Sequence, residues 1–269
     1  MTTRLGVCGW PVSHSRSPAM HNAALRALGL GDWRYQRLPI PPADFPATVK
    51  ALEAAGFRGV NVTIPHKQAA LAIADQATAT AEAVGAANML TLEAGRIAAD
   101  NTDVRGLLTA IGDHCAPAGR RALVLGAGGA GRAAVHALVQ AGAADVQVWN
   151  RTPERAERLA GELGGRAVTE PEPFDLVVQC TSVGLRNGDD PFKRLPVDAD
   201  AFAVGTCVVD MVYSAGGTAF LAAARAAGAD VVDGLEILVG QGAASLEHWI
   251  GRPVPIDVMR RAVQDDEAV

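Results

Sequence analysis

Three glycines near the middle of the chain have the spacing of a nucleotide-binding turn. Gly126, Gly128 and Gly131 follow an apolar segment and match the pattern G-x-G-x-x-G. The first glycine allows a tight turn, the second lets the backbone approach a pyrophosphate, and the third lets a helix pack closely on a strand. An alanine-rich helical segment and a second apolar segment, 146–149, complete a βαβ unit. We therefore expect a dinucleotide at residues 126–131, with its pyrophosphate on the N–H groups that begin the helix.

The residues after the second strand indicate which dinucleotide binds. An NAD site usually has an acidic residue there, which accepts a hydrogen bond from the ribose 2′-hydroxyl. This chain instead has Asn150, Arg151 and Thr152, with Arg155 one helical turn further on. Two guanidiniums can hold a 2′-phosphate, so we expect NADP(H). The pair Thr152-Pro153 also fits an ordinary helix start, and the two interpretations are compatible because a helix N-terminus favours phosphate.

The first motif of the N-terminal half suits a carboxylate ligand. The segment 13–18 reads Ser-His-Ser-Arg-Ser-Pro and joins a short apolar strand to a helix. Ser17 is expected as the N-cap and Pro18 as the first helical residue, with Ser15 just outside. Hydroxyl groups and a helix N-terminus beyond the end of a strand favour an anionic ligand, although a capped helix without a ligand has the same sequence.

A second motif of the same half brings an amine into a similar position. Asn61 and Thr63 interrupt an apolar strand, and Lys67 follows in the next turn. An ammonium beside a carbonyl group can donate or accept a proton, and His66 is an alternative carrier that is more often structural. Asp103 could pair with Lys67, although Asp100-Asn101-Thr102-Asp103 is also a typical helix cap. No further ligands at suitable spacing support a metal there.

Alternating strands and helices position these motifs. Apolar runs bounded by turn residues predict strands at 5–8, 35–38, 59–62, 176–178, 208–210 and 231–232, and a hairpin around Gly95. Helices are expected at 18–28, 42–55, 235–250 and 256–263, among others, and a long polar loop at 185–196. The chain is therefore α/β, with two domains: an N-terminal α/β domain with a mostly parallel sheet and a Rossmann-like dinucleotide-binding domain.

Composition excludes several classes of protein. The chain has 269 residues, 49% of them hydrophobic, and a net charge of −5, which gives no basic face for nucleic acid. No apolar run is long enough to cross a membrane, and we expect no signal peptide. Cys8, Cys115, Cys180 and Cys207 form no C-x-x-C pair, so we expect neither a disulfide framework nor a zinc site, and a cytoplasmic location.

Nine motifs in a fixed order resemble the shikimate dehydrogenase family over essentially the whole chain. After S-H-S-R-S-P and N-V-T-I-P-H-K come the segment around Asn88, D-N-T-D, G-A-G-G-A-G and N-R-T. T-S-V-G, D-M-V-Y and D-G-L-E-I-L-V-G-Q-G complete the order. The chain departs from many members at Gln179-Cys180, where Asn-Ala is usual, and at Ile237, where Met is common. Both departures resemble packing changes, although Gln179 could alter cofactor contacts.

The resemblance implies a role for each motif residue. It implies Lys67 and Asp103 as the catalytic pair. The residues implied to bind substrate are Ser15, Ser17, Asn61, Thr63, Asn88, Tyr213 and Gln241. Those implied to bind NADP(H) are Gly126, Ala127, Gly128, Gly129, Ala130, Gly131, Asn150, Arg151, Thr152, Arg155, Thr181, Ser182, Val183, Met211 and Gly234. No metal site is implied.

The same resemblance implies a reaction and a domain division. NADPH would reduce the ring ketone of 3-dehydroshikimate to shikimate, reversibly, with Lys67 supplying the proton and Asp103 orienting it. Residues 1–104 and 237–269 would bind substrate, residues 105–236 would bind NADP, and the active site would lie in the cleft between them. We expect a monomer or homodimer without a nucleic-acid or membrane partner. The alternatives are a quinate or NAD preference, a non-catalytic NADPH sensor and, more distantly, a tetrahydrofolate dehydrogenase.

Overall fold

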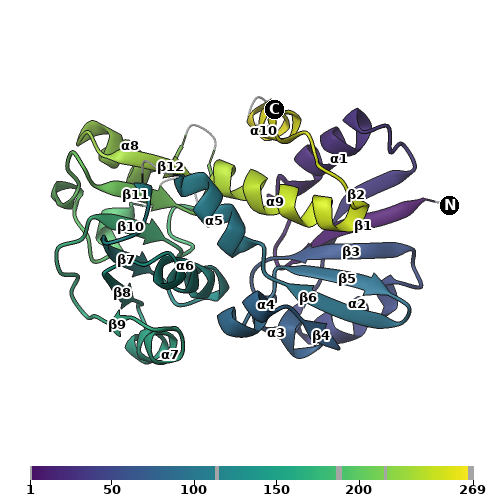
Figure 1. Ribbon diagram of the computed structural model, residues 1–269, viewed down its shortest axis with the longest axis horizontal. Coiled ribbons are helices and arrows are strands. Elements are labelled where there is room, and N and C mark those ends of the chain that lie inside the picture. Colours follow the sequence, from purple (N-terminus) through teal and green to yellow (C-terminus); the bar gives the residue numbers. More distant parts are fainter. Residues whose placement is uncertain (1, 113–114, 186–189, 215–216, 266–269) are drawn as a thin grey trace. The chain divides into compact units, whose positions relative to one another are not determined.

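The chain forms two compact units. The computed structural model describes residues 2–112, 115–185, 190–214 and 217–265 (Figure 1). Unit 1 contains residues 1–106 and 238–269, and unit 2 contains residues 107–237. The expected division lay at 104/105 and 236/237. The observed boundaries fall inside helices α5 (Asp103–Ile111) and α9 (Gly234–Ile250). A unit boundary inside a continuous helix has no turn or capping residue that would mark it in the sequence.

Unit 1 has a mixed sheet of six strands in the order β2-β1-β3-β5-β6-β4. Strand β1 is parallel to β2 and β3, and β4 is parallel to β6, whereas β5 is antiparallel to both of its neighbours. The hairpin expected around Gly95 is β5-β6, and it makes the sheet mixed rather than uniformly parallel. The strands are β1 (Thr3–Gly9), β2 (Trp33–Pro39), β3 (Phe57–Val62), β4 (Gln76–Ala77), β5 (Met89–Glu93) and β6 (Arg96–Asp100).

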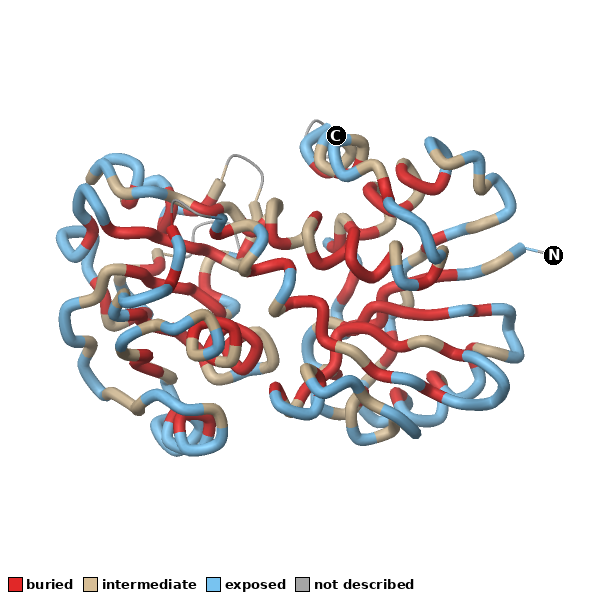
Figure 2. Tube along the Cα trace, in the orientation of Figure 1, coloured by how far each residue is buried: buried red, intermediate tan, exposed pale blue. Residues whose placement is uncertain are grey.

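Strand β3 shows how both faces of this sheet are covered. Val60 and Val62 point into an apolar cluster with Phe45 and Val49 of α2. Successive residues of a strand point to opposite faces of the sheet, so Gly59 and Asn61 face the other side. There, a Cβ at Gly59 would lie 2.2 Å from the Trp249 indole nitrogen of α9. Figure 2 shows buried backbone along these central strands. The remaining helices of unit 1 are α1 (Ser17–Ala27), η1 (Pro42–Asp44), α2 (Phe45–Leu52), α3 (Lys67–Ala72), α4 (Ala79–Val84) and α10 (Ile256–Asp265).

Unit 2 has a fully parallel sheet among its described residues, in the order β12-β11-β10-β7-β8-β9. This is the doubly wound order of dinucleotide-binding folds, and the order reverses between β7 and β10. The strands are β7 (Arg121–Leu125), β8 (Asp145–Trp149), β9 (Arg166–Ala167), β10 (Leu176–Gln179), β11 (Cys207–Asp210) and β12 (Asp230–Asp233). The helices are α6 (Gly129–Gln140), α7 (Pro153–Leu163) and α8 (Ala219–Ala226), with short turns η3 (Pro191–Lys193) and η4 (Ala199–Ala201).

Strand β9 had no prediction from sequence, because its two residues carry no clear periodic signal. Helix α8 is one of the alanine-rich segments, whose composition favours a helix. Within the polar loop expected at 185–196, residues 186–189 lie outside the described part of the chain.

The described residues contain one disulfide bond, which the spacing of the cysteines did not predict. Cys115 and Cys207 are bonded, with their Cα atoms 5.9 Å apart and a sequence separation of 92. Both are fully buried in unit 2, whereas Cys8 and Cys180 are buried thiols that form no disulfide. Sequence spacing carries no information about this pair, because Cys207 begins β11 and the segment around Cys115 reaches it only in the folded unit.

Removing this disulfide should destabilise the protein. A cross-link that closes a loop of this length restricts the unfolded chain and typically contributes about 2–4 kcal/mol. We expect the double substitution Cys115→Ala and Cys207→Ala to lower the free energy of unfolding in urea by about that amount, and Cys180→Ala to have a smaller effect. Alkylation of the denatured, unreduced protein should label Cys8 and Cys180 alone; labelling of all four cysteines would contradict the bond.

Candidate functional site

The loop that carries Ser15 and Ser17 is fixed from a neighbouring strand. The Arg37 guanidinium of β2 donates two hydrogen bonds to the Ser15 carbonyl oxygen, from Nε at 2.9 Å and from Nη2 at 2.6 Å. The predicted N-cap is wrong: Arg16 occupies that position and Ser17 is the first residue of α1. The Ser17 N–H donates to Ser15 Oγ at 3.3 Å, so the two serines form one polar corner at the start of α1.

The ends of β1 and β3 meet, because the two strands are parallel neighbours. The Thr63 N–H donates to the Cys8 carbonyl at 2.9 Å, and the Trp10 N–H donates to the Ile64 carbonyl at 3.0 Å. A Cβ at Gly9 would lie 2.5 Å from the Thr63 methyl group, so only glycine allows this approach. These contacts join the start of the loop after β1 to the segment that carries Thr63.

Lys67 and Asp103 form a close ion pair. Lys67 begins α3, Asp103 begins α5, and the distance from Lys67 Nζ to Asp103 Oδ2 is 2.6 Å. The side chains are 13% and 7% exposed, so the pair is largely screened from water. An ammonium has three N–H donors. Asp103 uses one, and no other described residue accepts from Lys67 Nζ, so two donors remain for a ligand.

Asn88 connects this pair to α9. Its Nδ2 lies within hydrogen-bond distance of three acceptors: Asp103 Oδ1 at 2.8 Å, Thr102 Oγ1 at 3.0 Å and Gln241 Oε1 at 3.2 Å. A carboxamide has two N–H donors, so the three acceptors compete for them. Gln241 can approach because Gly106 has no side chain: a Cβ there would lie 2.8 Å from the Gln241 backbone nitrogen.

Asn61 is held by Tyr35 and Ser245, two residues that the sequence analysis did not identify. Asn61 Nδ2 donates to Ser245 Oγ at 2.8 Å and to the Asn88 carbonyl at 3.2 Å, and its Oδ1 accepts from the Tyr35 hydroxyl at 2.8 Å. Both N–H donors of Asn61 are therefore used inside unit 1. Ser245 could have been suspected, since it lies one helical turn after Gln241 on an otherwise apolar helix face.

His66 is held as part of the core. Its ring stacks on Phe45 with the centroids 4.3 Å apart, and its Nε2 lies 2.8 Å from the Ile40 carbonyl oxygen. Burial lowers the pKa of His66, and the hydrogen bond with Ile40 opposes that effect. These contacts favour the structural role for His66 over that of a proton carrier.

In unit 2, the glycine turn is built as its sequence predicts. A Cβ at Gly131 would lie 1.9 Å from the Gly126 carbonyl oxygen, and Gly126 has a positive φ of 113°. A Cβ at Gly128 would meet nothing within 4 Å, and no side chain caps the α6 N-terminus that follows it. Free N–H groups beside open space fit the pyrophosphate of a dinucleotide.

The end of β8 has free cationic side chains. Asn150 is engaged: its Oδ1 accepts from the Ala127 N–H at 3.1 Å and its Nδ2 donates to the Thr152 carbonyl at 2.9 Å. Arg151 and Arg155 are exposed, and neither guanidinium has a partner among the described residues. Thr152 is the N-cap of α7 as predicted, but its side chain makes no capping hydrogen bond. These residues fit a 2′-phosphate.

The family resemblance implies that residues 181–183 and Met211 lie along the nicotinamide side of the cofactor. These two segments follow β10 and β11, which are parallel neighbours, so they meet at the same edge of the sheet. A Cβ at Gly126 would lie 3.0 Å from the Thr181 methyl group, at the reversal of strand order between β7 and β10. The segment after β11 carries Met211 and Tyr213. Gly234 packs on it, where a Cβ would lie 2.8 Å from the Val212 carbonyl oxygen. Ligands of doubly wound sheets bind at this reversal.

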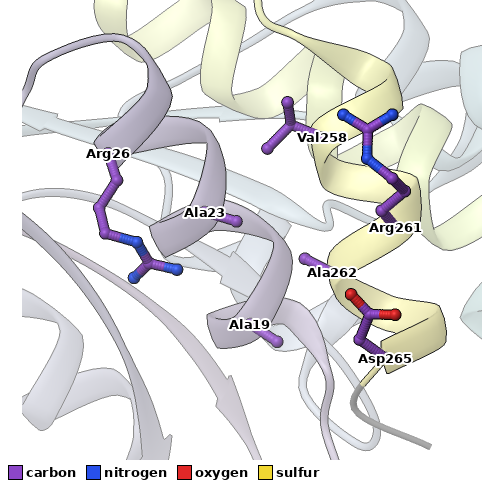
Figure 3. Close-up of a pocket in the computed structure, with 7 residues that line it drawn as sticks. All are labelled: Ala19, Ala23, Arg26, Val258, Arg261, Ala262 and Asp265. Carbon is purple, nitrogen blue, oxygen red and sulfur yellow. The ribbon is translucent and has the colours of Figure 1, made fainter.

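A surface cavity of about 490 Å³ lies apart from the predicted site residues. It is formed by α1 and α10 in unit 1, and Figure 3 shows its lining side chains: Ala19, Ala23, Arg26, Val258, Arg261, Ala262 and Asp265. Within the described residues no cluster of three or more metal-ligating side chains occurs. No helix in the described ranges is both long and apolar enough to cross a membrane.

The strand order and glycine turn of unit 2 define a protein of the Rossmann dinucleotide-binding class, and comparisons with known proteins specify the family. Residues 7–90 match the shikimate dehydrogenase substrate binding domain, residues 112–181 match the shikimate / quinate 5-dehydrogenase family, and residues 234–264 match the shikimate 5'-dehydrogenase C-terminal domain. A shikimate dehydrogenase (NADP(+)) of Citrifermentans bemidjiense is 44% identical, over 96% of this chain and 93% of its own.

Solved structures agree with these matches. Shikimate dehydrogenase from Aquifex aeolicus is similar with a TM-score of 0.91 and 36% identity, covering 98% of both chains. Shikimate 5-dehydrogenase from Thermus thermophilus, in complex with NADP(H) and shikimate, has a TM-score of 0.88 and 42% identity, covering 98% of this chain and 99% of its own. This chain belongs to the shikimate dehydrogenase family.

Proposed function

We propose that this protein is an NADP-dependent dehydrogenase that interconverts 3-dehydroshikimate and shikimate. The observation that carries the proposal is the Lys67–Asp103 pair, in which an ammonium is held 2.6 Å from a carboxylate and keeps two N–H donors for a ligand. The names of the relatives described above support the same activity and cofactor.

The residues of unit 1 bind the substrate and transfer a proton to it. Ser15 and Ser17 bind the carboxylate, and Thr63, Asn88 and Gln241 bind ring hydroxyls. When bound, NADPH would supply the hydride for the carbonyl carbon and would thereby be oxidised to NADP⁺. Lys67 donates a proton to the carbonyl oxygen as its negative charge develops, so that the ketone gains one hydride and one proton to become an alcohol. Asp103 keeps the ammonium oriented. The reverse reaction returns the proton to Lys67.

In unit 2, the glycine turn holds the pyrophosphate and the arginines at the end of β8 hold the 2′-phosphate. Thr181, Ser182, Val183 and Met211 would lie along the nicotinamide side, and Gly234 would also contact the cofactor. Tyr213 is implied to bind the substrate. Each of these roles follows from the family resemblance and can be tested by substituting the residue.

Replacing Arg151 by alanine should reduce NADP selectivity. A charge-assisted hydrogen bond contributes about 1.5–3 kcal/mol, which corresponds to roughly 10- to 150-fold in kcat/KM for NADP⁺. The kcat/KM for NAD⁺ should change little, because NAD⁺ has no 2′-phosphate. Arg158→Ala is the matched control, since Arg158 is also exposed on α7. An equal loss with both cofactors would contradict this role for Arg151.

A steady-state assay tests the proposed activity against its alternatives. We expect shikimate-dependent reduction of NADP⁺, with kcat/KM lower for quinate and for NAD⁺. A higher kcat/KM for quinate or NAD⁺ would select the related dehydrogenase with that preference. NADPH binding without turnover of any of these substrates would select the non-catalytic sensor.

We also propose a cytoplasmic location and a monomeric or dimeric state. The Cys115–Cys207 bond is fully buried, so reductants in solution reach it only when unit 2 opens. Fractionation of cells, with thiol counting on the protein from each fraction, tests the location. Sedimentation equilibrium of the purified protein tests the oligomeric state.

A further inference from the structure

Gln179 is a buried amide at the end of β10, and its contacts are unusual for a strand residue. The residue is only 1% exposed to solvent. Its Oε1 accepts a short hydrogen bond from the Thr181 N–H, and its Nε2 donates to the Val183 carbonyl at 2.9 Å. One carboxamide therefore bonds both ends of the turn at 181–183. The shorter side chain of asparagine, which lacks one methylene group, would have to move the backbone to make both contacts.

The same amide connects this turn to the segment after β11. Gln179 Nε2 also lies 3.3 Å from Asp210 Oδ1, which accepts from the Val212 N–H at 3.0 Å. Asp210 Oδ2 accepts from the Thr218 hydroxyl at 2.7 Å. Burial raises the pKa of Asp210 to about 7, an effect that these hydrogen bonds oppose. The buried side chains of Gln179 and Asp210 thus bond to each other and to the backbone of both the turn at 181–183 and the segment after β11.

Further contacts make the two segments one structural unit. The Met211 N–H donates to the Gln179 carbonyl at 2.9 Å, and the Cys180 sulfur lies 3.4 Å from the Met211 sulfur. On the other side, a Cβ at Gly234 would lie 2.8 Å from the Asp210 carbonyl oxygen. Residues 181–183 and 211 are the ones that the family resemblance places along the nicotinamide side, and Gly234 is implied to bind the cofactor.

We propose that Gln179 is a positioning residue for the nicotinamide end of NADP(H). Its amide sets the spacing between the turn at 181–183 and the segment at 211–212, and thereby the width of the nicotinamide site. This inference rests on the proposed function. Gln179 itself is buried and acts through the backbone of residues 181 and 183, not by touching the cofactor.

The test compares the whole cofactor with a fragment that lacks nicotinamide. Gln179→Met keeps the approximate volume and removes the hydrogen bonds. We expect it to weaken NADPH binding roughly tenfold in calorimetry, because two or three hydrogen bonds are lost. Binding of adenosine 2′,5′-bisphosphate should remain within about twofold of wild type, since that fragment reaches only the glycine turn and the arginines. Gln179→Asn retains an amide and should show a smaller loss for NADPH.

Gln147→Met provides the matched control. Gln147 is also a fully buried amide in a strand of the same sheet, and it bonds backbone groups of Glu172, with the Glu172 N–H donating to its Oε1 at 2.8 Å. We expect its substitution to leave the NADPH-to-fragment ratio unchanged. The inference would be overturned if Gln179→Met weakened the binding of NADPH and of adenosine 2′,5′-bisphosphate equally, or weakened the binding of neither. If the methionine variant does not fold, Gln179→Asn is judged by the same two outcomes. Failure of the wild-type protein to bind NADPH would instead overturn the proposed function.

Discussion

Replacing Lys67 by methionine should lower kcat for shikimate oxidation by about 10²- to 10⁴-fold, the usual contribution of a positioned general acid or base. Methionine retains the length and apolar stem of lysine and removes its charge and donors. Because the substrate is also held by other residues of unit 1, the KM for shikimate should change much less than kcat. Steady-state kinetics with saturating NADP⁺ measure both constants.

The controls for this prediction separate chemistry from folding. Lys50→Met removes an exposed lysine on α2 and should leave kcat unchanged. Asp103→Asn leaves Lys67 without its ion-pair partner and should lower kcat in the same direction as Lys67→Met. Shikimate binding measured by calorimetry establishes that both variants are folded. A Lys67→Met variant that binds shikimate and retains the wild-type kcat would remove Lys67 from the reaction.

The Gly131→Ala substitution should damage unit 2 and its cofactor site together. Its Cβ would lie 1.9 Å from the Gly126 carbonyl oxygen and 2.8 Å from the Gly126 carbonyl carbon. Both are backbone atoms, so α6 must move away from the turn. We expect the free energy of unfolding to fall by about 2–3 kcal/mol, in the upper range for overpacking, and the KM for NADP⁺ to rise at least about tenfold.

Two other glycines are informative controls for this prediction. Gly161 lies inside α7 with nothing within 4 Å of its Cβ position, so Gly161→Ala should be neutral or stabilise the protein by up to about 1 kcal/mol. Gly128 also has an open Cβ position, but that space is assigned to the pyrophosphate. Gly128→Ala should therefore weaken NADPH binding with little change in unfolding. Gly131→Ala with wild-type stability and KM would contradict the close packing of α6 on β7.

Local signals made unit 2 predictable from sequence. The glycine turn, β7, α6 and β8 are contiguous, so the glycine spacing together with the strand and helix patterns around it predicted a dinucleotide site there. Helix caps were less informative. Thr152 is an N-cap without a capping hydrogen bond, and the cap of α1 is Arg16 rather than Ser17.

Contacts between distant segments were not predictable from residue spacing alone. Nothing local in the chain indicates that Lys67 should meet Asp103 rather than another carboxylate, and the pairing was one possibility among several. The contacts of Ser245 with Asn61, and the bond between Cys115 and Cys207, depend on which strands become neighbours. The family resemblance supplied the expected roles of the site residues, whereas the structure supplied Tyr35, Ser245 and the contacts of Gln179.

A crystal structure of the ternary complex with shikimate and NADP⁺ tests the central claim most directly. The claim predicts Lys67 Nζ within about 2.6–3.2 Å of one ring hydroxyl oxygen of shikimate, with nicotinamide C4 against the carbon that carries this hydroxyl. Asp103 should remain bonded to Lys67. A complex in which Lys67 contacts no ring hydroxyl, or in which the nicotinamide lies against a different part of shikimate, would contradict it.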